Sequence, residues 1–267
     1  MPYTTDSRDF ETLVENAPQG SKKILAEGDS WFAYPRKFIA FGKDANIIDH
    51  LGDKNDLIIY NTSSNGDEAV SMLSGEQKFS LIKRLKHNEF DFLLFSGGGN
   101  DIVGKFDFDF FIREKTAERT WENCIHNDRV ELKISQIKAS YEILCELTID
   151  YSKNQNIKII THTYDDMLPT DEGFELFDLI PFGKSWLHPF LMKKNITDFN
   201  DQRNIVYHLL DKFRDAVNEV AQNYDFFTVV DTRGTIDEDE WRNEIHPDSS
   251  GFGKIADKIL QEGINIV

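Results

Sequence analysis

The chain has very little cysteine and a deficit of basic residues. Only two cysteines, Cys124 and Cys145, occur in 267 residues, and they form no Cys-x-x-Cys pair. This argues against a disulfide framework or a thiolate zinc site, so we expect a reducing, cytoplasmic location. Lys and Arg number 30 against 47 Asp and Glu, which gives a net charge of -17. Because phosphate backbones and anionic lipids repel such a charge, neither nucleic acid nor an anionic membrane is expected as a partner.

Long apolar runs and linkers are also missing. Residues 1–16 contain no basic start followed by an apolar stretch, and no run approaches the roughly 18 apolar residues of a membrane span. We therefore expect no signal peptide and no transmembrane segment, with export without a signal peptide as the alternative to the cytoplasm. No internal repeat or Gly/Ser linker divides the sequence. With 40% hydrophobic residues, the chain is long enough for one well-buried core, so a single domain over residues 1–267 is expected.

Short apolar runs alternate with helical patterns along the chain. The runs are continuous in hydrophobicity, as in strands that helices cover on both faces. They lie at residues 23–26, 57–60, 90–95, 157–161 and 226–230. Between or after them, residues 130–144, 205–220 and 252–259 carry apolar side chains at the 3.6-residue period of a helix. This alternation predicts a three-layer α/β domain with a parallel sheet.

Two aromatic segments fall outside the alternation. Residues 104–120 interleave Phe with Asp, and residues 165–200 combine aromatic residues with prolines without clean periodicity. Both begin at the carboxyl ends of predicted strands, where ligands bind in open parallel sheets, and long loops there are often lids or binding loops. We interpret about 165–200 as an aromatic-rich insert that forms a lid or pocket wall or, alternatively, a contact in a homo-oligomer. The candidate substrate contacts are Trp31, Phe182 and Trp186.

Residues suited to acyl transfer follow separate predicted strands. Ser30 comes after Gly28-Asp29, and a serine at such a turn is either a helix N-cap or a nucleophile. Gly66 and Asn100 follow the next two runs along the chain, where a backbone N–H and a side-chain amide can face a developing negative charge. His246 lies near the C-terminus, before a predicted helix. Nucleophile, base and oxyanion donors at one sheet edge are what acyl transfer requires.

In order and spacing, these four blocks resemble the SGNH hydrolase superfamily, also called GDSL-type esterases and lipases, from Gly28 to Pro247. The resemblance implies a flavodoxin-like fold with a five-stranded parallel sheet between helices. It also implies that Ser30 is the nucleophile and His246 the general base. The oxyanion hole would consist of the backbone N–H groups of Ser30 and Gly66 and the side-chain amide of Asn100. No cofactor and no metal are implied.

One position departs from the family pattern. The family usually has an Asp three residues before the histidine, and Asn243 stands there. An asparagine carbonyl can accept the imidazole N–H, but it supplies no negative charge to stabilise the imidazolium. Three alternatives follow. Asn243 orients the ring, or a backbone carbonyl does so while Ser30 and His246 act as a dyad, or the missing acid is replaced by one of Asp237, Asp239 and Glu244.

Other polar residues near the blocks are expected to build the site rather than to react. Asp29 and Asp101 are interpreted as carboxylates that accept loop N–H groups, and His162 as a satisfied polar residue near the core. The glycines at 97–99 lack the Lys-Ser/Thr of a phosphate-binding loop and the spacing of a dinucleotide-binding motif. The seven histidines include no His-Glu-x-x-His, so no metal site is expected.

The sequence therefore predicts a serine hydrolase that cleaves carboxylic esters of a small molecule, a glycan or a lipid. Acetyl or short acyl groups are favoured, because no basic or amphipathic surface for docking on a membrane is evident. The acidic composition favours neutral or cationic esters, unless Arg36 and Lys37 reverse the local charge. The alternative, which the missing Asp keeps open, is a catalytically weak or silent module that binds carbohydrate or lipid on the same fold.

Overall fold

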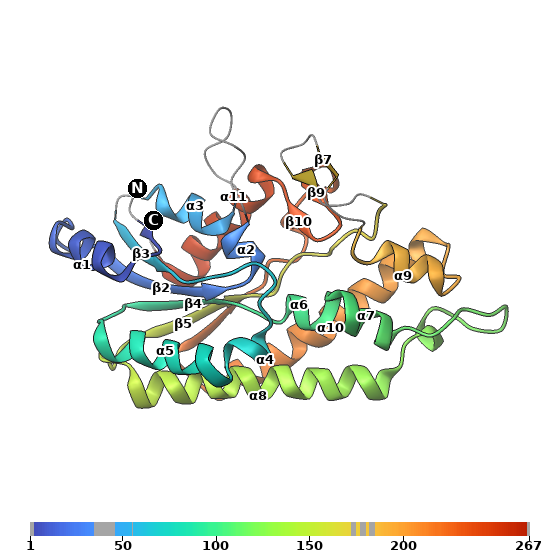
Figure 1. Cartoon of the computed structure of the whole chain (residues 1–267), viewed down its shortest axis with the longest axis horizontal. Coiled ribbons are helices and arrows are strands. Elements are labelled where there is room, and N and C mark those ends of the chain that lie inside the picture. The colour runs from blue at the N-terminus through green and yellow to red at the C-terminus, as the bar shows by residue number, and fades with distance from the viewer. Residues whose placement is uncertain are drawn as a thin grey trace.

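A six-stranded parallel sheet forms the centre of the molecule (Figure 1). The computed structural model describes residues 3–34, 46–54, 56–171, 175–176, 180–181 and 185–265. The strand order is β1-β3-β2-β4-β5-β8. The strands are β1 (Tyr3–Thr4), β2 (Lys22–Gly28), β3 (Leu57–Asn61), β4 (Phe92–Ser96), β5 (Lys158–His162) and β8 (Phe227–Val230).

The predicted α/β fold is confirmed, with one strand more than expected. Five strands coincide with the five apolar runs to within a few residues. The sixth, β1, is a two-residue edge strand that pairs with β3 at Tyr3 and Ile59, and so short a segment leaves no pattern in the sequence. All residues of β3 and β4 are buried, because the sheet is covered on both faces. This double coverage explains why the runs are continuous rather than alternating.

Helices form the two outer layers. Figure 1 shows α3 and α11 on one side of the sheet and α5, α8 and α10 on the other. The predicted helical stripes face the core: Ile137 of α8, Leu209 of α10 and Ile255 of α11 are each fully buried. The helices of the layers are α1 (Ser7–Glu15), α3 (Ile47–Gly52), α4 (Ala69–Met72), α5 (Gly75–His87), α8 (Asn127–Tyr151), α10 (Phe199–Ala221) and α11 (Ser249–Lys258), which continues into the π-helical η3 (Ile259–Ile264).

Short elements gather beyond the carboxyl ends of the strands. A single turn or two of helix follows β2 and β4, and a hairpin precedes α11. These elements are α2 (Ser30–Ala33), α6 (Gly99–Val103), α7 (Lys105–Phe111), η1 (Glu122–Cys124), η2 (Glu238–Glu240) and the hairpin strands β9 (Trp241–Asn243) and β10 (His246–Pro247).

The two aromatic segments differ from each other. Residues 104–120 begin with α7, whose Phe108 and Phe111 are buried in the core, so this part is a packed helix rather than a binding loop. Within 165–200 the structure places the two-stranded ladder of β6 (Glu175–Leu176) and β7 (Ile180–Pro181), then α9 (His188–Lys193). In the ranges that the structure describes, no helix is both long and apolar enough to cross a membrane.

Candidate active site

Ser30 and His246 contact each other at the carboxyl end of the sheet. Ser30 is the first residue of α2, and Asp29 caps that helix by accepting the N–H of Trp31 at 3.0 Å. His246 is the first residue of β10, and its Nε2 lies 2.7 Å from Oγ of Ser30. Ser30 is 8% exposed and His246 4%, so the pair is largely shielded from water. Two residues at opposite ends of the sequence thus form one hydrogen-bonded pair.

Asn243 holds the other side of the imidazole. In the β9–β10 hairpin it pairs with His246, and its Oδ1 lies 3.1 Å from Nδ1 of the ring. The same oxygen accepts the backbone N–H groups of Ile245 at 3.1 Å and His246 at 3.0 Å. Those backbone donors identify which end of the amide faces the ring, because only the oxygen can accept them. The Nδ1 nitrogen therefore carries the proton, and the lone pair of Nε2 faces Ser30.

The nearby acids point elsewhere. Glu244 is buried, and its carboxylate accepts backbone N–H groups of Leu187 and His188. Asp237 lies 2.6 Å from Nζ of Lys254, and Asp239 is exposed. Of the three alternatives for orienting the imidazole, this geometry favours Asn243.

Burial keeps the imidazole neutral. The pKa of His246 falls to about 3, first because burial disfavours the charged ring and second because the Arg242 guanidinium repels it. A neutral ring at physiological pH can accept a proton from a hydroxyl group. The arrangement therefore provides a base next to a serine without an anion behind it.

The candidate oxyanion donors lie on the segments that follow β2, β3 and β4, and hydrogen bonds tie these segments together. The Ser64 N–H donates to the Gly28 carbonyl at 2.9 Å, and Nδ2 of Asn100 donates to the Asp67 carbonyl at 2.8 Å, which leaves its second N–H for another acceptor. Gly66 precedes Asp67 and has φ +83°, a conformation that favours glycine. Within the described ranges, the backbone N–H groups of Gly66 and Ser30 donate no hydrogen bond. These donors are chemically suited to an anion.

The turn that leads into α6, the short helix that contains Asn100, requires glycine at position 98. Gly98 has φ +108°, and a Cβ atom there would lie 2.3 Å from the Phe213 ring. Asp101, next to Asn100, accepts the N–H groups of Ala69 at 2.7 Å and Val70 at 3.4 Å. Asp101 thus has the loop-bonding role expected of it.

A buried hydrogen-bond network lies beneath the nucleophile. Asp29 accepts the hydroxyls of Ser96 at 2.9 Å and Tyr164 at 2.5 Å. The His162 ring bridges this network, with Nε2 2.9 Å from the Ser96 hydroxyl and Nδ1 accepting the Tyr164 N–H at 3.2 Å. Burial raises the pKa of Asp29 to about 6 and lowers that of His162 to about 3. Asp29 and His162 therefore have the structural roles expected of them, whereas Ser96 and Tyr164 were missed.

The three candidate substrate contacts have different outcomes. Trp31 lies in the core, 2% exposed, with Nε1 donating to the Ile245 carbonyl at 3.1 Å and its ring stacked on His162. The expectation that Trp31 contacts substrate is therefore corrected, since its buried ring supports the β9–β10 hairpin that contains His246. Trp186 does reach the site: its ring stands edge-on to that of His246, with centroids 6.1 Å apart and planes at 84°. Phe182 lies outside the described residues.

One aromatic neighbour of the base was not anticipated. The Tyr34 ring is buried and its centroid lies 4.5 Å from that of His246. Its hydroxyl lies 3.5 Å from Nδ2 of Asn243. The only signal for Tyr34 was its closeness in sequence to Ser30. Arg36 and Lys37, which follow it, lie outside the described residues.

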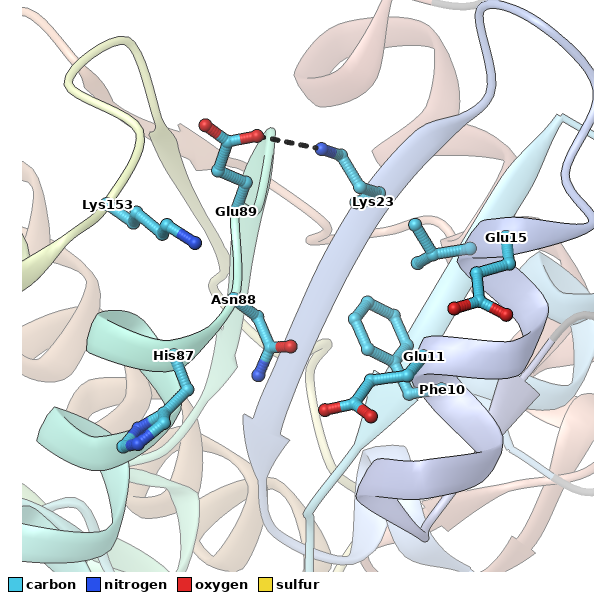
Figure 2. Close-up of a pocket in the computed structure, with 9 residues that line it drawn as sticks. Phe10, Glu11, Glu15, Lys23, His87, Asn88, Glu89 and Lys153 are labelled. Carbon is cyan, nitrogen blue, oxygen red and sulfur yellow. Dashed lines mark ion pairs between the residues drawn. The ribbon is translucent and has the colours of Figure 1, made fainter.

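A separate hollow of about 260 Å³ opens at the opposite end of the sheet. Figure 2 shows Phe10 and Glu11 of α1 pointing toward Asn88, and an ion pair between Lys23 and Glu89 at 3.6 Å above them. These residues lie in α1, in β2 near its start, or in the connection that precedes β4, and the hollow contains none of the candidate catalytic residues. Among the residues that the structure describes, no group of three or more His, Cys, Asp and Glu side chains is placed to hold a metal ion.

Comparison with known proteins detects similarity only in structure. No protein-family model and no curated protein matches the sequence. A lipase from a goat rumen metagenome has a TM-score of 0.55 at 13% identity, with 91% of this chain and 98% of that chain covered. A catalytic mutant of an acetylxylan esterase from Geobacillus stearothermophilus has a TM-score of 0.52 at 16% identity, with coverages of 91% and 94%.

A third solved structure bears directly on the sequence resemblance. A member of the lipolytic G-D-S-L family from Veillonella parvula has a TM-score of 0.50 at 12% identity, with 91% of this chain and 99% of that chain covered. At such low identities, the comparison shows that the fold is shared and gives no information on the substrate. The chain therefore has the α/β fold of the SGNH, or GDSL-type, hydrolases.

Proposed function

We propose that this chain is a cofactor-independent serine hydrolase that cleaves carboxylic esters through an acyl-enzyme. The observation that carries the proposal is the 2.7 Å contact between Oγ of Ser30 and Nε2 of His246. The Asn243 oxygen on Nδ1 supports it, because this contact leaves the Nε2 lone pair directed at the hydroxyl. An SGNH hydrolase fold supports the same class of reaction.

In the acylation step, His246 takes the proton of the Ser30 hydroxyl as Oγ attacks the ester carbonyl carbon. The carbonyl oxygen becomes an oxyanion, which the N–H groups of Ser30, Gly66 and Asn100 stabilise. The C–O bond to the alcohol then breaks, and the protonated imidazole gives its proton to the leaving oxygen. The products are a free alcohol and an ester between the acyl group and Ser30.

In the deacylation step, a water molecule replaces the alcohol. His246 takes a proton from that water while the water oxygen attacks the acyl carbon. The same N–H groups stabilise the second oxyanion. Breakdown of this intermediate releases the carboxylic acid, and His246 returns the proton to Ser30. Asn243 holds the imidazole in one tautomer through both steps. Because Asn243 is neutral, the imidazolium is stabilised less than it would be beside a carboxylate.

The substrate class is an ester with a short acyl group, acetyl being the simplest case. The buried position of Ser30 and His246 supports a confined acyl site. The structural neighbours include an acetylxylan esterase and a lipase, whose substrates are both carboxylic esters. The net charge of -17 favours neutral or cationic esters over anionic ones.

An active-site serine probe tests the proposal. A fluorophosphonate is expected to label the folded wild-type protein at Ser30 and to leave Ser30→Ala unlabelled, since the probe requires an activated hydroxyl. p-Nitrophenyl esters of increasing chain length are expected to be hydrolysed with a preference for acetate. A folded wild-type protein that neither labels nor hydrolyses any of these esters would overturn the proposal. That result would favour the silent carbohydrate- or lipid-binding module, which the neutral Asn243 keeps as the second candidate.

A further inference from the structure

The Glu244 carboxylate joins the β9–β10 hairpin, which contains His246, to the segment that contains Trp186. Glu244 is completely buried. Its Oε2 accepts the backbone N–H groups of Trp186 and of Leu187, the latter at 2.9 Å, and its Oε1 accepts the His188 N–H at 2.8 Å. Its backbone carbonyl also accepts the N–H of Leu168 at 3.2 Å. One residue of the hairpin therefore ties down three consecutive residues that lie far from it in sequence.

This link is electrostatically unusual. Among the described residues, no Lys or Arg pairs with the Glu244 carboxylate, so the three N–H groups are what compensates its charge. Burial of the charge, aided by Asp171, raises the pKa of Glu244 to about 7. A buried carboxylate is stable only when its oxygens are hydrogen-bonded, and bonds from N–H groups to an ionised acceptor are stronger than bonds between neutral groups. The link therefore depends on a side chain at position 244 with two acceptor oxygens, which an amide does not provide.

The link fixes an aromatic side chain beside the base. Trp186, the first of the three tethered residues, stands edge-on to the His246 ring. Asn243, adjacent to Glu244 in the chain, holds the same ring from Nδ1. Two neighbouring residues of the hairpin thus fix the base and the tryptophan next to it.

Building on the proposed function, we propose that Glu244 is a positioning residue that sets Trp186 as the wall for the alcohol part of the ester. The base delivers its proton to the leaving oxygen, so a side chain packed against the base lies on the leaving-group side. A tryptophan face or edge favours flat apolar groups, such as an aryl ring. The substrate class that this geometry selects is therefore an ester of an alcohol with a flat ring.

The test holds the acyl group constant and changes the alcohol. In Glu244→Gln, the KM for p-nitrophenyl acetate is expected to rise about tenfold relative to wild type, while its kcat changes less than about threefold. The KM for ethyl acetate, which has no ring, is expected to change less than about twofold. Comparing each variant with wild type on the same ester removes the difference in intrinsic reactivity between the two leaving groups.

A double-mutant cycle tests whether Glu244 acts through Trp186. Trp186→Ala is expected to raise the KM for p-nitrophenyl acetate to a similar extent, and Trp186→Ala combined with Glu244→Gln is expected to add nothing further. If the two substitutions raise the KM independently, so that their effects multiply in the double variant, the proposal is overturned. An equal rise in KM for p-nitrophenyl acetate and ethyl acetate would also overturn it.

A matched control separates positioning from general loss of stability. Asp165 is also a buried carboxylate with three consecutive backbone donors, the N–H groups of Gly234, Thr235 and Ile236 at 2.7, 2.8 and 2.7 Å. Asp165→Asn disturbs a comparable set of bonds, none of which involves residues 186–188. It is expected to lower the melting temperature as much as Glu244→Gln without selective loss on the aryl ester. The same selective loss in both variants would overturn the proposal.

Amide hydrogen exchange provides a readout that needs no turnover. Exchange at residues 186–188 is expected to be at least tenfold faster in Glu244→Gln and unchanged in Asp165→Asn. Unchanged exchange in Glu244→Gln would overturn the link itself. Labelling of wild-type Ser30 by the fluorophosphonate tests the proposed hydrolase function independently. Failure of the positioning role of Glu244 can therefore be distinguished from failure of the hydrolase function.

Discussion

The side-chain oxygen of Asn243 lies 3.1 Å from Nδ1 of His246, where the sequence resemblance leads one to expect an aspartate. The oxygen orients the imidazole as a carboxylate would, but it adds no negative charge. Burial, and after it the Arg242 guanidinium, keeps the pKa of His246 near 3, and no carboxylate in contact with the ring opposes them. The candidate site therefore combines an oriented base with a weakly stabilised imidazolium.

Removal of the asparagine side chain should separate the orienting role from a dyad. We expect Asn243→Ala to lower kcat/KM about 10³-fold, about 4 kcal/mol of transition-state stabilisation, because the imidazole loses the side-chain oxygen that lies against Nδ1. Steady-state kinetics on p-nitrophenyl acetate measure the loss. Asn243 also accepts two backbone N–H groups, so thermal unfolding must show that the variant is folded. A loss of only a few fold would mean that Ser30 and His246 act as a dyad.

The pH dependence of the wild-type protein should reflect the lowered pKa of the base. A general base works when deprotonated, so kcat/KM falls as the pH drops through its pKa. With the pKa of His246 near 3 instead of the ordinary 6.5, activity should persist at pH 5 for as long as the protein stays folded. Circular dichroism at each pH provides the control for acid unfolding.

A carboxylate at position 243 should shift this profile. In Asn243→Asp, the added negative charge favours the imidazolium and raises the pKa of His246. The acidic limb of kcat/KM should move to higher pH, and kcat at pH 8 should rise about tenfold because the transition state contains the imidazolium. A profile identical to that of the wild type would contradict the assignment of His246 as the base.

The amide of Asn100 should matter for the rate and not for substrate binding. Asn100→Ala is expected to lower kcat by about 10²- to 10³-fold with little change in KM, because an oxyanion donor acts mainly on the transition state. The side chain also bonds to the Asp67 carbonyl, so the stability of the variant must be measured alongside its kinetics. An unchanged kcat would remove Asn100 from the oxyanion hole.

The hydroxyl of Tyr164 should stabilise the fold in a pH-dependent manner. The folded pKa of Asp29 is about 6, above its ordinary 3.8, so the folded state binds more protons and stability falls as pH rises through that window. Tyr164 donates to the carboxylate and lowers its pKa, so Tyr164→Phe should raise that pKa further. The expected loss is about 1.5–3 kcal/mol of unfolding free energy at pH 8 and clearly less at pH 5, measured by urea unfolding.

Tyr141→Phe is the matched control for this measurement. The Tyr141 hydroxyl is equally buried, but it donates to the neutral Gly97 carbonyl at 2.7 Å. Its removal should cost a similar amount of stability at both pH values. Equal losses for Tyr164→Phe at pH 5 and pH 8 would contradict an ionised Asp29 in the folded protein at pH 8.

The sheet was predictable because the pattern of a doubly covered parallel strand is local. Each of the runs from 23–26 to 226–230 is continuous in hydrophobicity, and each became a strand of the sheet. Ser30 and His246 could be chosen because both follow elements that end at one edge of that sheet. The edge strand β1 escaped prediction because two residues carry no periodicity.

The surroundings of the base could not be predicted in the same way. Asn243 ends β9 and Glu244 begins the turn before β10, and no local sequence pattern says where the side chain of a turn residue points. Only the register of the hairpin shows that Asn243 faces the ring and that Glu244 binds residues 186–188. Trp31 was misjudged for a similar reason, since a ring beside a nucleophile in sequence can turn into the core.

The sequence by itself determined where strands and helices alternate along the chain and which residue types follow each strand. It could do so because hydrophobic periodicity and turn residues act over a few positions. Tertiary structure alone decided which atoms meet: that Nε2 of His246 reaches Ser30, that an amide oxygen fills the place of a carboxylate, and that Tyr164 lies under Asp29. Such contacts depend on how loops from separate strands pack at one edge, and hydrogen-bond geometry over a few tenths of an ångström is not encoded in any local pattern.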